Sequence, residues 1–312
     1  MVEAVSPGKV DAVVLIAFGG PTARHEIRPF LANVTRGRRI APERLEEVVH
    51  HYERMPGARS PLNELTLAQA RALAAVLARR GAPVEVHVGM RNWHPYLHET
   101  LGELKARGVR RCLGIIMSPL RCEASWDRYR QDVSEALART GGAPEVVFAP
   151  PWAARSGFVA ALADRIGDVL RGLPEDGRRW TPMVFTAHSI PVAMAEASPY
   201  VDDFTAVVHA VVSVLDHARW SLAYQSRSGR PEDSWLEPDV GSVVASLAAD
   251  GERDAIVVPA GFVCDHVEVL YDLDVEAVEA ARARGVALHR AATVGDHPAF
   301  IEALADLVLE AW

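Results

Sequence analysis

Short apolar runs alternate with amphipathic segments along almost the whole chain. The clearest runs are residues 12–17, 111–119, 183–191 and 256–258, each containing β-branched side chains and closely followed or closed by Gly or Pro. Continuous apolar runs of this length are typical of parallel strands that are covered on both faces. The longer segments between them carry apolar residues at helical spacing. Strand and helix in regular alternation predict parallel sheets with right-handed crossovers.

This alternating scheme runs through the chain twice. The adjacent prolines at 150 and 151 mark the expected boundary, which gives an N-terminal α/β half over residues 1–150 and a C-terminal half over 151–312. The last helix, 298–312, packs either on its own half or back on the first. The predicted fold class is therefore α/β, with two similar Rossmann-like or flavodoxin-like parallel-sheet halves that face a central cleft.

Two of the predicted strands end in polar side chains. The run ending at Pro191 presents His188, and the strand at 256–258 leads into a segment that carries Glu268. In open α/β sheets, ligands bind outside the carboxyl ends of the strands. An imidazole and a carboxylate brought together there can take up protons or hold a borderline metal ion.

The acidic residues after the second strand end have two interpretations. Glu268, Asp272 and Glu276 lie four residues apart, so a helix from Val267 onward would align them on one face. Acidic side chains also favour the positive end of a helix dipole, and charge runs usually form solvated faces. Likewise, a single histidine such as His188 is often only hydrogen-bonded, and the residues alone leave these alternatives open.

Composition excludes several classes of protein. The net charge of -8 and pI near 5.8 provide no basic excess for a general nucleic-acid binder. The chain has no apolar run long enough to span a bilayer and no signal-peptide core at its start, so we expect a cytoplasmic protein with no integral membrane segment. The 3 cysteines show no CxxC spacing, which argues against a disulfide framework or a zinc ribbon. The turn AFGGPT lacks the three spaced glycines of a dinucleotide-binding fingerprint.

A series of short motifs spans nearly the whole chain, and in its order and spacing it resembles the ferrochelatase family. The motifs are AFGGP, RPFL, RSPLN, MRNWHPY, TAHSIP, YQSRSG, SWLEPDV, GFVCDHVEVLYDLDVE and PAFIEAL. The resemblance implies the chelatase fold and an enzyme of haem biosynthesis, a lyase that inserts Fe(II) into a porphyrin and releases two pyrrole protons. It carries the family's catalytic and metal-binding histidine and glutamate onto His188 and Glu268. Asp272 and Glu276 match a further metal-delivery or outer metal site.

The resemblance also suggests how the porphyrin is bound. Arg36, with Arg38 and Arg39 beside it, is the candidate for the propionates, although such a basic loop can also be a solvated connector. Four propionates favour coproporphyrin III over protoporphyrin IX, and the segment LRCEASWDRYRQDV resembles the short form found in coproporphyrin-using relatives. The candidate porphyrin-contacting side chains are Phe18, Met117, Trp126, Tyr129, Ile190 and Trp235.

Further expectations concern cofactors and partners. Phe18 stands where Gram-positive relatives tend to have tyrosine, which excludes a phenolate ligand at that position. No cysteine follows Cys264, so we expect no [2Fe-2S] cluster and no permanently bound cofactor, with porphyrin and ferrous iron as the partners of a monomer. Two alternatives remain, namely a chelatase for another metal and tetrapyrrole, and a non-catalytic tetrapyrrole carrier. A carrier needs an apolar slot but no paired base, so the presence of both His188 and Glu268 argues against it.

Overall fold

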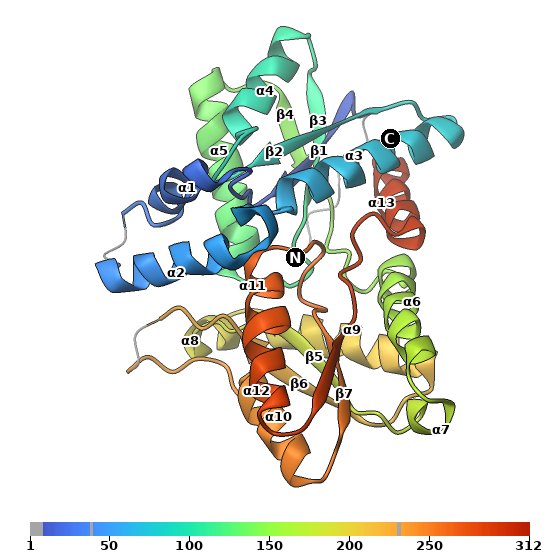
Figure 1. Ribbon diagram of the computed structural model, residues 1–312. Helices are drawn as coiled ribbons and strands as arrows, with labels where there is room; N and C mark the ends of the chain where they lie inside the picture. The colour runs from blue at the N-terminus through green and yellow to red at the C-terminus, as the bar shows by residue number, and fades with distance from the viewer. Residues whose placement is uncertain (1–8, 38–39, 230–231) are drawn as a thin grey trace. The chain divides into compact units, whose positions relative to one another are not determined.

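The computed structural model describes residues 9–37, 40–229 and 232–312, and the chain forms two compact units (Figure 1). Unit 1 comprises the described residues up to Ser118 together with Glu123–Trp152 and Gly295–Trp312. Unit 2 comprises Pro119–Cys122 and Ala153–Val294. The segment Gly295–Trp312, which contains the last helix, is thus part of unit 1.

Each unit is built on a four-stranded, wholly parallel sheet, which confirms the predicted fold class of two parallel-sheet α/β halves. In unit 1 the order is β2-β1-β3-β4, and in unit 2 it is β6-β5-β7-β8, the same arrangement repeated. The first sheet consists of β1 (Ala12–Ala17), β2 (Glu85–Met90), β3 (Arg111–Ile116) and β4 (Glu145–Phe148). The second consists of β5 (Met183–His188), β6 (Trp220–Gln225), β7 (Asp254–Val258) and β8 (Ala287–Arg290).

The helices of unit 1 cover its sheet with apolar faces. Its longer helices are α1 (Ile27–Val34), α2 (Pro42–Arg54), α3 (Leu62–Arg79), α4 (Leu97–Ala106), α5 (Arg128–Thr140) and α13 (Pro298–Glu310). Leu101 of α4 and Val133 of α5 share one buried cluster with Val14 and Ile16 of β1. These alternate strand residues point to one face, as the two-residue repeat of a strand requires.

Helix α13 is joined to α3, although the two are more than 200 residues apart in the sequence. The side-chain amide of Gln69 donates a 2.8 Å hydrogen bond to the carbonyl oxygen of Gly295, and Arg80 Nη1 lies 2.8 Å from Asp306 Oδ1. The ring of Phe300 in α13 also lies 5.3 Å, centroid to centroid, from that of Trp152.

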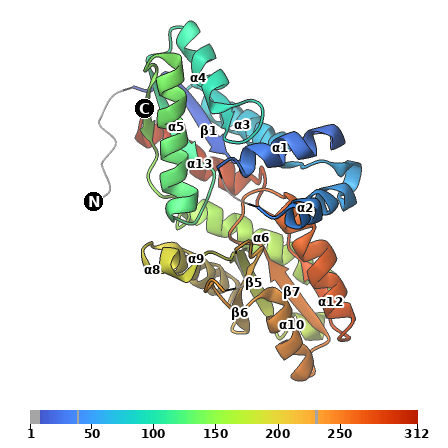
Figure 2. The same cartoon turned by 90° about the vertical axis from the view of Figure 1, so that its left-hand side faces the viewer.

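Unit 2 has the same layered construction. Its helices are α6 (Ser156–Gly172), α7 (Glu175–Arg178), α8 (Val192–Glu196), α9 (Tyr200–Leu215), α10 (Val240–Ala249), α11 (Val267–Leu270) and α12 (Val278–Arg282). Val244 of α10 and Val269 of α11 are buried in one cluster with Val184 of β5 and Val257 of β7. Turning the molecule by 90° shows the strands and helices of this unit from the side (Figure 2).

Candidate functional site

The candidate site of unit 2 lies at the carboxyl ends of its strands, and His188 is the last residue of β5. Its backbone is held on two sides. Gln225, the last residue of β6, pairs with His188 in the parallel register and accepts a 2.7 Å hydrogen bond from the Ser189 amide. The buried hydroxyl of Tyr200 donates a 2.8 Å hydrogen bond to the carbonyl oxygen of His188. The imidazole therefore projects from a fixed backbone position.

Glu268 reaches the same place from the segment after β7. His266 caps helix α11, because its Nδ1 accepts a 3.1 Å hydrogen bond from the Glu268 amide. The side-chain amide of Gln225 donates a hydrogen bond to the Glu268 carbonyl oxygen. Both backbone polar groups of Glu268 are thus occupied, which leaves only its carboxylate free to turn.

His188 and Glu268 form an imidazole and carboxylate pair, with Nε2 and Oε1 3.5 Å apart. Burial disfavours the charge on His188, but Glu268 and the Ser189 carbonyl oxygen at Nδ1 more than offset it, so the pKa of His188 is raised. Burial also opposes ionisation of Glu268, and the nearby His188 and His266 outweigh it, so the pKa of Glu268 is lowered. The side chains are 28% and 37% exposed, so the pair is accessible to a ligand.

Asp272 is the second carboxyl group of this region. Burial raises its pKa to about 7, and the neighbouring carboxylates of Glu268 and Glu276 act in the same direction, whereas a hydrogen bond from the Ser226 hydroxyl opposes the rise. Ser226 has a left-handed backbone, with φ of 61°. Asp272 can therefore gain or lose a proton near neutral pH.

The backbone that carries these carboxylates differs from the regular helix considered in the sequence. Helix α11 ends at Leu270, and the π-helix Asp272–Ala277 follows it. The amides of Val275 and Glu276 both donate to the Tyr271 carbonyl oxygen, at 3.1 and 3.0 Å. A π-helix has a wider turn than an α-helix and is frequent at functional sites. The four-residue spacing therefore does not describe one regular α-helical face.

Phe18 and Arg36 belong to unit 1. Phe18 directly follows β1, is 38% exposed and meets the ring of Phe30 edge to face at 6.4 Å between centroids. Arg36 is exposed, and its guanidinium donates a 2.7 Å hydrogen bond to the side-chain oxygen of Asn33. Arg38 and Arg39 lie outside the described residues.

Three more candidates for porphyrin contact in unit 1 are buried. Met117 follows β3, Trp126 lies in a π-helix at Glu123–Asp127, and Tyr129 lies in α5, with exposures of 7%, 5% and 6%. The indole N–H of Trp126 donates to the Ser118 carbonyl oxygen, and the guanidinium of Arg91 covers the Tyr129 ring at 4.5 Å. Their contact with a porphyrin stays a prediction.

In unit 2, Ile190 and Trp235 lie on adjoining segments. The Ile190 carbonyl oxygen accepts a 3.0 Å hydrogen bond from the Leu236 amide, and Pro191 pairs with Trp235 in an isolated bridge. Trp235 packs so closely on Gly229 that a Cβ there would lie 2.2 Å from the indole. Its indole N–H is buried and has no hydrogen-bond partner within the described ranges, so it is available as a donor.

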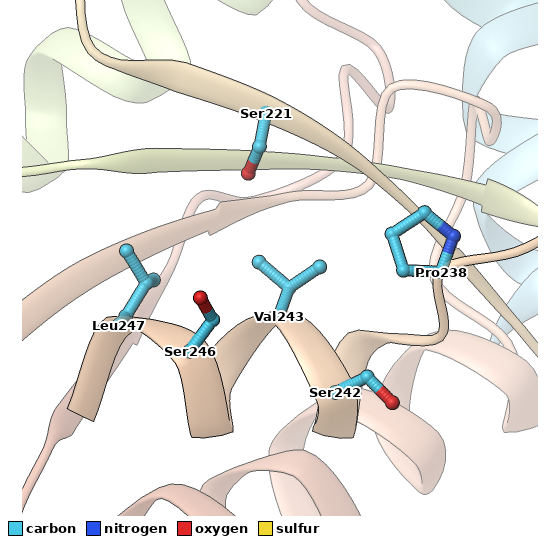
Figure 3. A pocket seen from close by; sticks show the side chains of 6 residues that line it. All are labelled: Ser221, Pro238, Ser242, Val243, Ser246 and Leu247. Atoms are coloured by element: carbon cyan, nitrogen blue, oxygen red, sulfur yellow. The ribbon is translucent and has the colours of Figure 1, made fainter. Parts of the chain in front are cut away.

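Sequence patterns alone assign no role to Gln225 or Ser226, although both lie in the YQSRSG motif. Their contacts to Glu268 and Asp272 depend on how β6 pairs with β5 and on the course of the chain after β7, so residue type alone could not reveal them. A separate hollow of unit 2 lies beside α10 (Figure 3), lined by Ser221, Pro238, Ser242, Val243, Ser246 and Leu247. None of these six side chains titrates in the physiological range, so this hollow offers no acid, base or strong metal ligand.

Two further observations on the described residues concern metal binding and membrane spanning. In the part of the chain that the structure describes, no group of three or more His, Cys, Asp and Glu side chains is arranged to hold a metal ion. No helix within residues 9–37, 40–229 and 232–312 combines the length and the apolar composition needed to cross a membrane.

Comparison with known proteins places the chain among its relatives. The family model for ferrochelatase matches residues 10–312. The chain is 40% identical over 304 residues to a coproporphyrin III ferrochelatase of Mycolicibacterium smegmatis, covering 96% of this chain and 89% of that protein. It is 42% identical over 316 residues to a coproporphyrin III ferrochelatase of Frankia alni (97% and 80% covered), and 38% identical over 306 residues to a ferrochelatase of Rhodopirellula baltica (96% and 86% covered).

Solved structures support the fold. SirB from Bacillus subtilis with Fe3+ superposes with a TM-score of 0.59 at 12% identity, covering 96% of this chain and 94% of that one. CbiX, described as the terminal enzyme for siroheme biosynthesis in denitrifying bacteria, gives a TM-score of 0.57 at 14% identity, with 96% and 99% covered. At these identities the similarity concerns the fold alone.

Proposed function

The chain belongs to the ferrochelatase family, and from this premise we propose that it inserts ferrous iron into coproporphyrin III with His188 and Glu268 as the catalytic pair. Iron insertion replaces the two inner pyrrole N–H protons of the porphyrin by the metal. The reaction needs bases beside the macrocycle and ligands that exchange with the water on the incoming iron. The observation that carries the proposal is the 3.5 Å approach of His188 Nε2 to Glu268 Oε1 at the strand ends.

The surroundings of His188 suggest how the pair works. With the Ser189 carbonyl oxygen at Nδ1 and the Glu268 carboxylate at Nε2, both ring nitrogens face acceptors, which favours the protonated imidazolium. A ferrous ion bound by Glu268 would neutralise the carboxylate and so lower the pKa of His188. The imidazole would release its proton to solvent and become free to take a pyrrole proton or to bind the metal.

Asp272 and Glu276 extend the proposed route for iron or protons. Asp272, with its pKa raised to about 7, can exchange a proton at neutral pH. The proposed porphyrin-contacting residues are Phe18, Met117, Trp126 and Tyr129 in unit 1, and Ile190 and Trp235 in unit 2, with Arg36 serving the propionates.

The choice of coproporphyrin III rests on two supports. Several relatives at about 40% identity bear that substrate in their names. Coproporphyrin III also has four propionates where protoporphyrin IX has two, so an exposed cation such as Arg36 favours it. We further propose a cytoplasmic monomer, classed as a lyase, for which iron is a substrate and not a resident cofactor.

The proposal is tested by anaerobic iron insertion, followed through the porphyrin absorption bands. Purified protein receives ferrous iron with coproporphyrin III or protoporphyrin IX, beside the variants His188→Ala and Glu268→Gln. The matched control is His289→Ala in β8, which removes a histidine that also pairs with a carboxylate. Its Nε2 lies 2.7 Å from Oδ1 of Asp254, the first residue of β7 and so at the opposite end of that strand from the candidate site.

We expect faster turnover of coproporphyrin III, lost in both site variants and kept in the control. Equal or faster turnover of protoporphyrin IX would reject the proposed substrate. Porphyrin binding without insertion of iron would reject catalysis and favour a carrier.

A further inference from the structure

One buried guanidinium in unit 2 joins two parts of the segment that carries the candidate site. Arg290, the last residue of β8, is 15% exposed in its side chain. Its Nη1 and Nη2 atoms lie 3.2 and 3.3 Å from the two carboxylate oxygens of Asp265. Its Nε atom lies 2.5 Å from Asp274 Oδ1, and Nη2 lies 3.0 Å from Asp274 Oδ2. Arg290 thus makes a two-pronged contact with each of two carboxylates.

The two carboxylates bound by Arg290 lie on either side of the candidate site residues in the sequence. Asp265 precedes Glu268 by three residues, and Asp274 follows Asp272 by two, inside the π-helix. Arg290 therefore holds both ends of the segment from which Glu268 and Asp272 project. Thr293 adds a 2.9 Å hydrogen bond from its hydroxyl to Asp265 Oδ1.

We propose that Arg290 is a positioning residue for iron binding, which fixes the geometry of Glu268 and Asp272 by clamping Asp265 and Asp274 in one double fork. This inference rests on the proposed function. Without the guanidinium, the half-buried carboxylate of Asp265 and the more exposed carboxylate of Asp274, which now share one cation, would repel each other and move apart. Because a π-helix is a single wide turn, such a movement would displace the site carboxylates as well.

A purely electrostatic role makes the opposite prediction, so the two roles can be separated. Removing a positive charge beside the site would make it more attractive to Fe(II) and lower the KM for iron. Loss of the clamp would raise that KM. Lysine keeps the charge but is a point charge that cannot form two bidentate forks. If Arg290 acts only through its charge, Arg290→Lys should therefore have the wild-type KM for iron. If Arg290 positions the site, Arg290→Lys should keep a raised KM for iron.

The experiment compares Arg290→Gln and Arg290→Lys with the wild type in anaerobic iron insertion, with KM measured separately for iron and for coproporphyrin III. Arg219→Gln is the matched control, since Arg219 also pairs with one carboxylate, Glu252, but precedes the opposite end of β6. Far-UV circular dichroism and melting temperatures show whether each variant is folded. If Arg290→Gln does not fold, Arg290→Lys, which keeps the buried charge balance, carries the test.

We expect the KM for iron to rise about tenfold in both Arg290 variants, as is typical for residues that orient metal ligands. The KM for coproporphyrin III should stay within about twofold, because a structural collapse would raise both values. Arg219→Gln should leave both unchanged. A KM for iron at or below the wild-type value in Arg290→Gln, or full restoration in Arg290→Lys, would overturn the inference.

Cobalt(II) binding, followed by its visible absorption, tests the clamp without turnover, so a failure of the proposed function remains distinguishable from a failure of this inference. The cobalt signal is assigned to the site by its loss in His188→Ala. We expect weaker cobalt binding in Arg290→Lys by a similar factor. Cobalt binding equal to that of the wild type, or no site-specific cobalt binding in the wild type, would overturn the inference.

Discussion

His188 and Glu268 set each other's charge state, which is a property of single residues. Burial alone would lower the pKa of an imidazole, but the pKa of His188 is raised because Glu268 outweighs it. In Glu268→Gln, burial should dominate, and the pKa of His188 should fall below the ordinary value of 6.5. The measurement is an NMR titration of labelled histidine, with the His188 signal assigned by its absence in His188→Ala.

The same pair should also make stability depend on pH. A raised histidine pKa stabilises the fold below pH 6.5 and loses its effect as pH rises through the folded value. A lowered glutamate pKa stabilises the fold above pH 4.5 and loses its effect as pH falls through the folded value. The stability difference between the wild type and Glu268→Gln should therefore be largest between these two pH values. The control for the stability measurement is Asp254→Asn, which removes the carboxylate that pairs with His289. The proposed coupling would be refuted if the His188 titration were the same in Glu268→Gln as in the wild type.

Asp272 provides a second prediction at this scale. Its pKa is raised from 3.8 to about 7, first by burial, so the folded protein keeps a proton that the unfolded chain has already lost. The contribution of Asp272 to the stability of the wild type should therefore fall as pH rises between these values. Asp272→Asn has no charge to bury and should be more stable than the wild type at pH 8, by roughly 2 kcal/mol after allowance for partial exposure. At pH 4 the advantage should vanish.

Urea unfolding at the two pH values measures this difference. Asp250→Asn, an exposed position just after α10, is the matched control and should show little dependence on pH. An Asp272→Asn variant that is less stable than the wild type at pH 8 would mean that the ionised carboxylate stabilises the fold.

At the scale of elements, the end of β5 packs closely against the segment after β7, and this contact sets the position of His188. A Cβ built on Gly261 would lie 2.8 Å from both Cα and Cβ of Ala187, the residue before His188. Gly261→Ala should push the end of β5 away, reduce iron insertion and lower the free energy of unfolding by about 1–3 kcal/mol. The matched control is Gly172→Ala in α6. A Cβ built on Gly172 has no atom within 4 Å, so this substitution should be tolerated. Equal activity in both variants would show that the end of β5 can move without consequence.

The sequence predicted those elements whose signal is local. Residues 12–17 form β1 with the expected bounds, because an apolar run closely followed by Gly and Pro is typical of a buried strand. Strand β8, Ala287–Arg290, was not predicted, since its four residues, ALHR, contain no β-branched side chain and do not alternate between polar and apolar. Its pairing with β7 is a tertiary contact. The π-helix Asp272–Ala277 was missed because a wide turn leaves no periodic pattern in so short a segment.

In the candidate site, too, some residues could be proposed from local sequence patterns, whereas others depend on tertiary contacts. His188 and Glu268 could be proposed from the sequence because each lies at or after the end of an apolar run, where polar side chains are conspicuous. The residues that hold the site, Gln225, Ser226 and Arg290, lie on other strands or beyond their ends. Their partners are 16 to 46 positions away in the sequence, so they became visible only once the strand order was known.

At the scale of the whole molecule, the end of the chain completes the first unit. The ring of Phe300 in α13 is 1% exposed and packs on Trp152, whose indole N–H donates a 2.9 Å hydrogen bond to the Ile116 carbonyl oxygen at the end of β3. Helix α13 therefore packs into a core whose strands, β1 and β3, lie much earlier in the sequence. It follows that a defect in α13 should weaken the two units unequally.

Phe300→Ala tests this dependence. Loss of a fully buried ring should cost about 3–5 kcal/mol of unfolding free energy. Hydrogen exchange followed by mass spectrometry should show the loss of protection in β1 and β3 of unit 1, with a smaller change in β5 and β7 of unit 2, because Phe300 packs on unit 1. Leu67→Ala in α3, at a side chain that is 39% exposed, is the matched control and should change little. Equal loss of protection in both units would mean that they unfold as one cooperative body, and that the chain's return to unit 1 stabilises the whole protein.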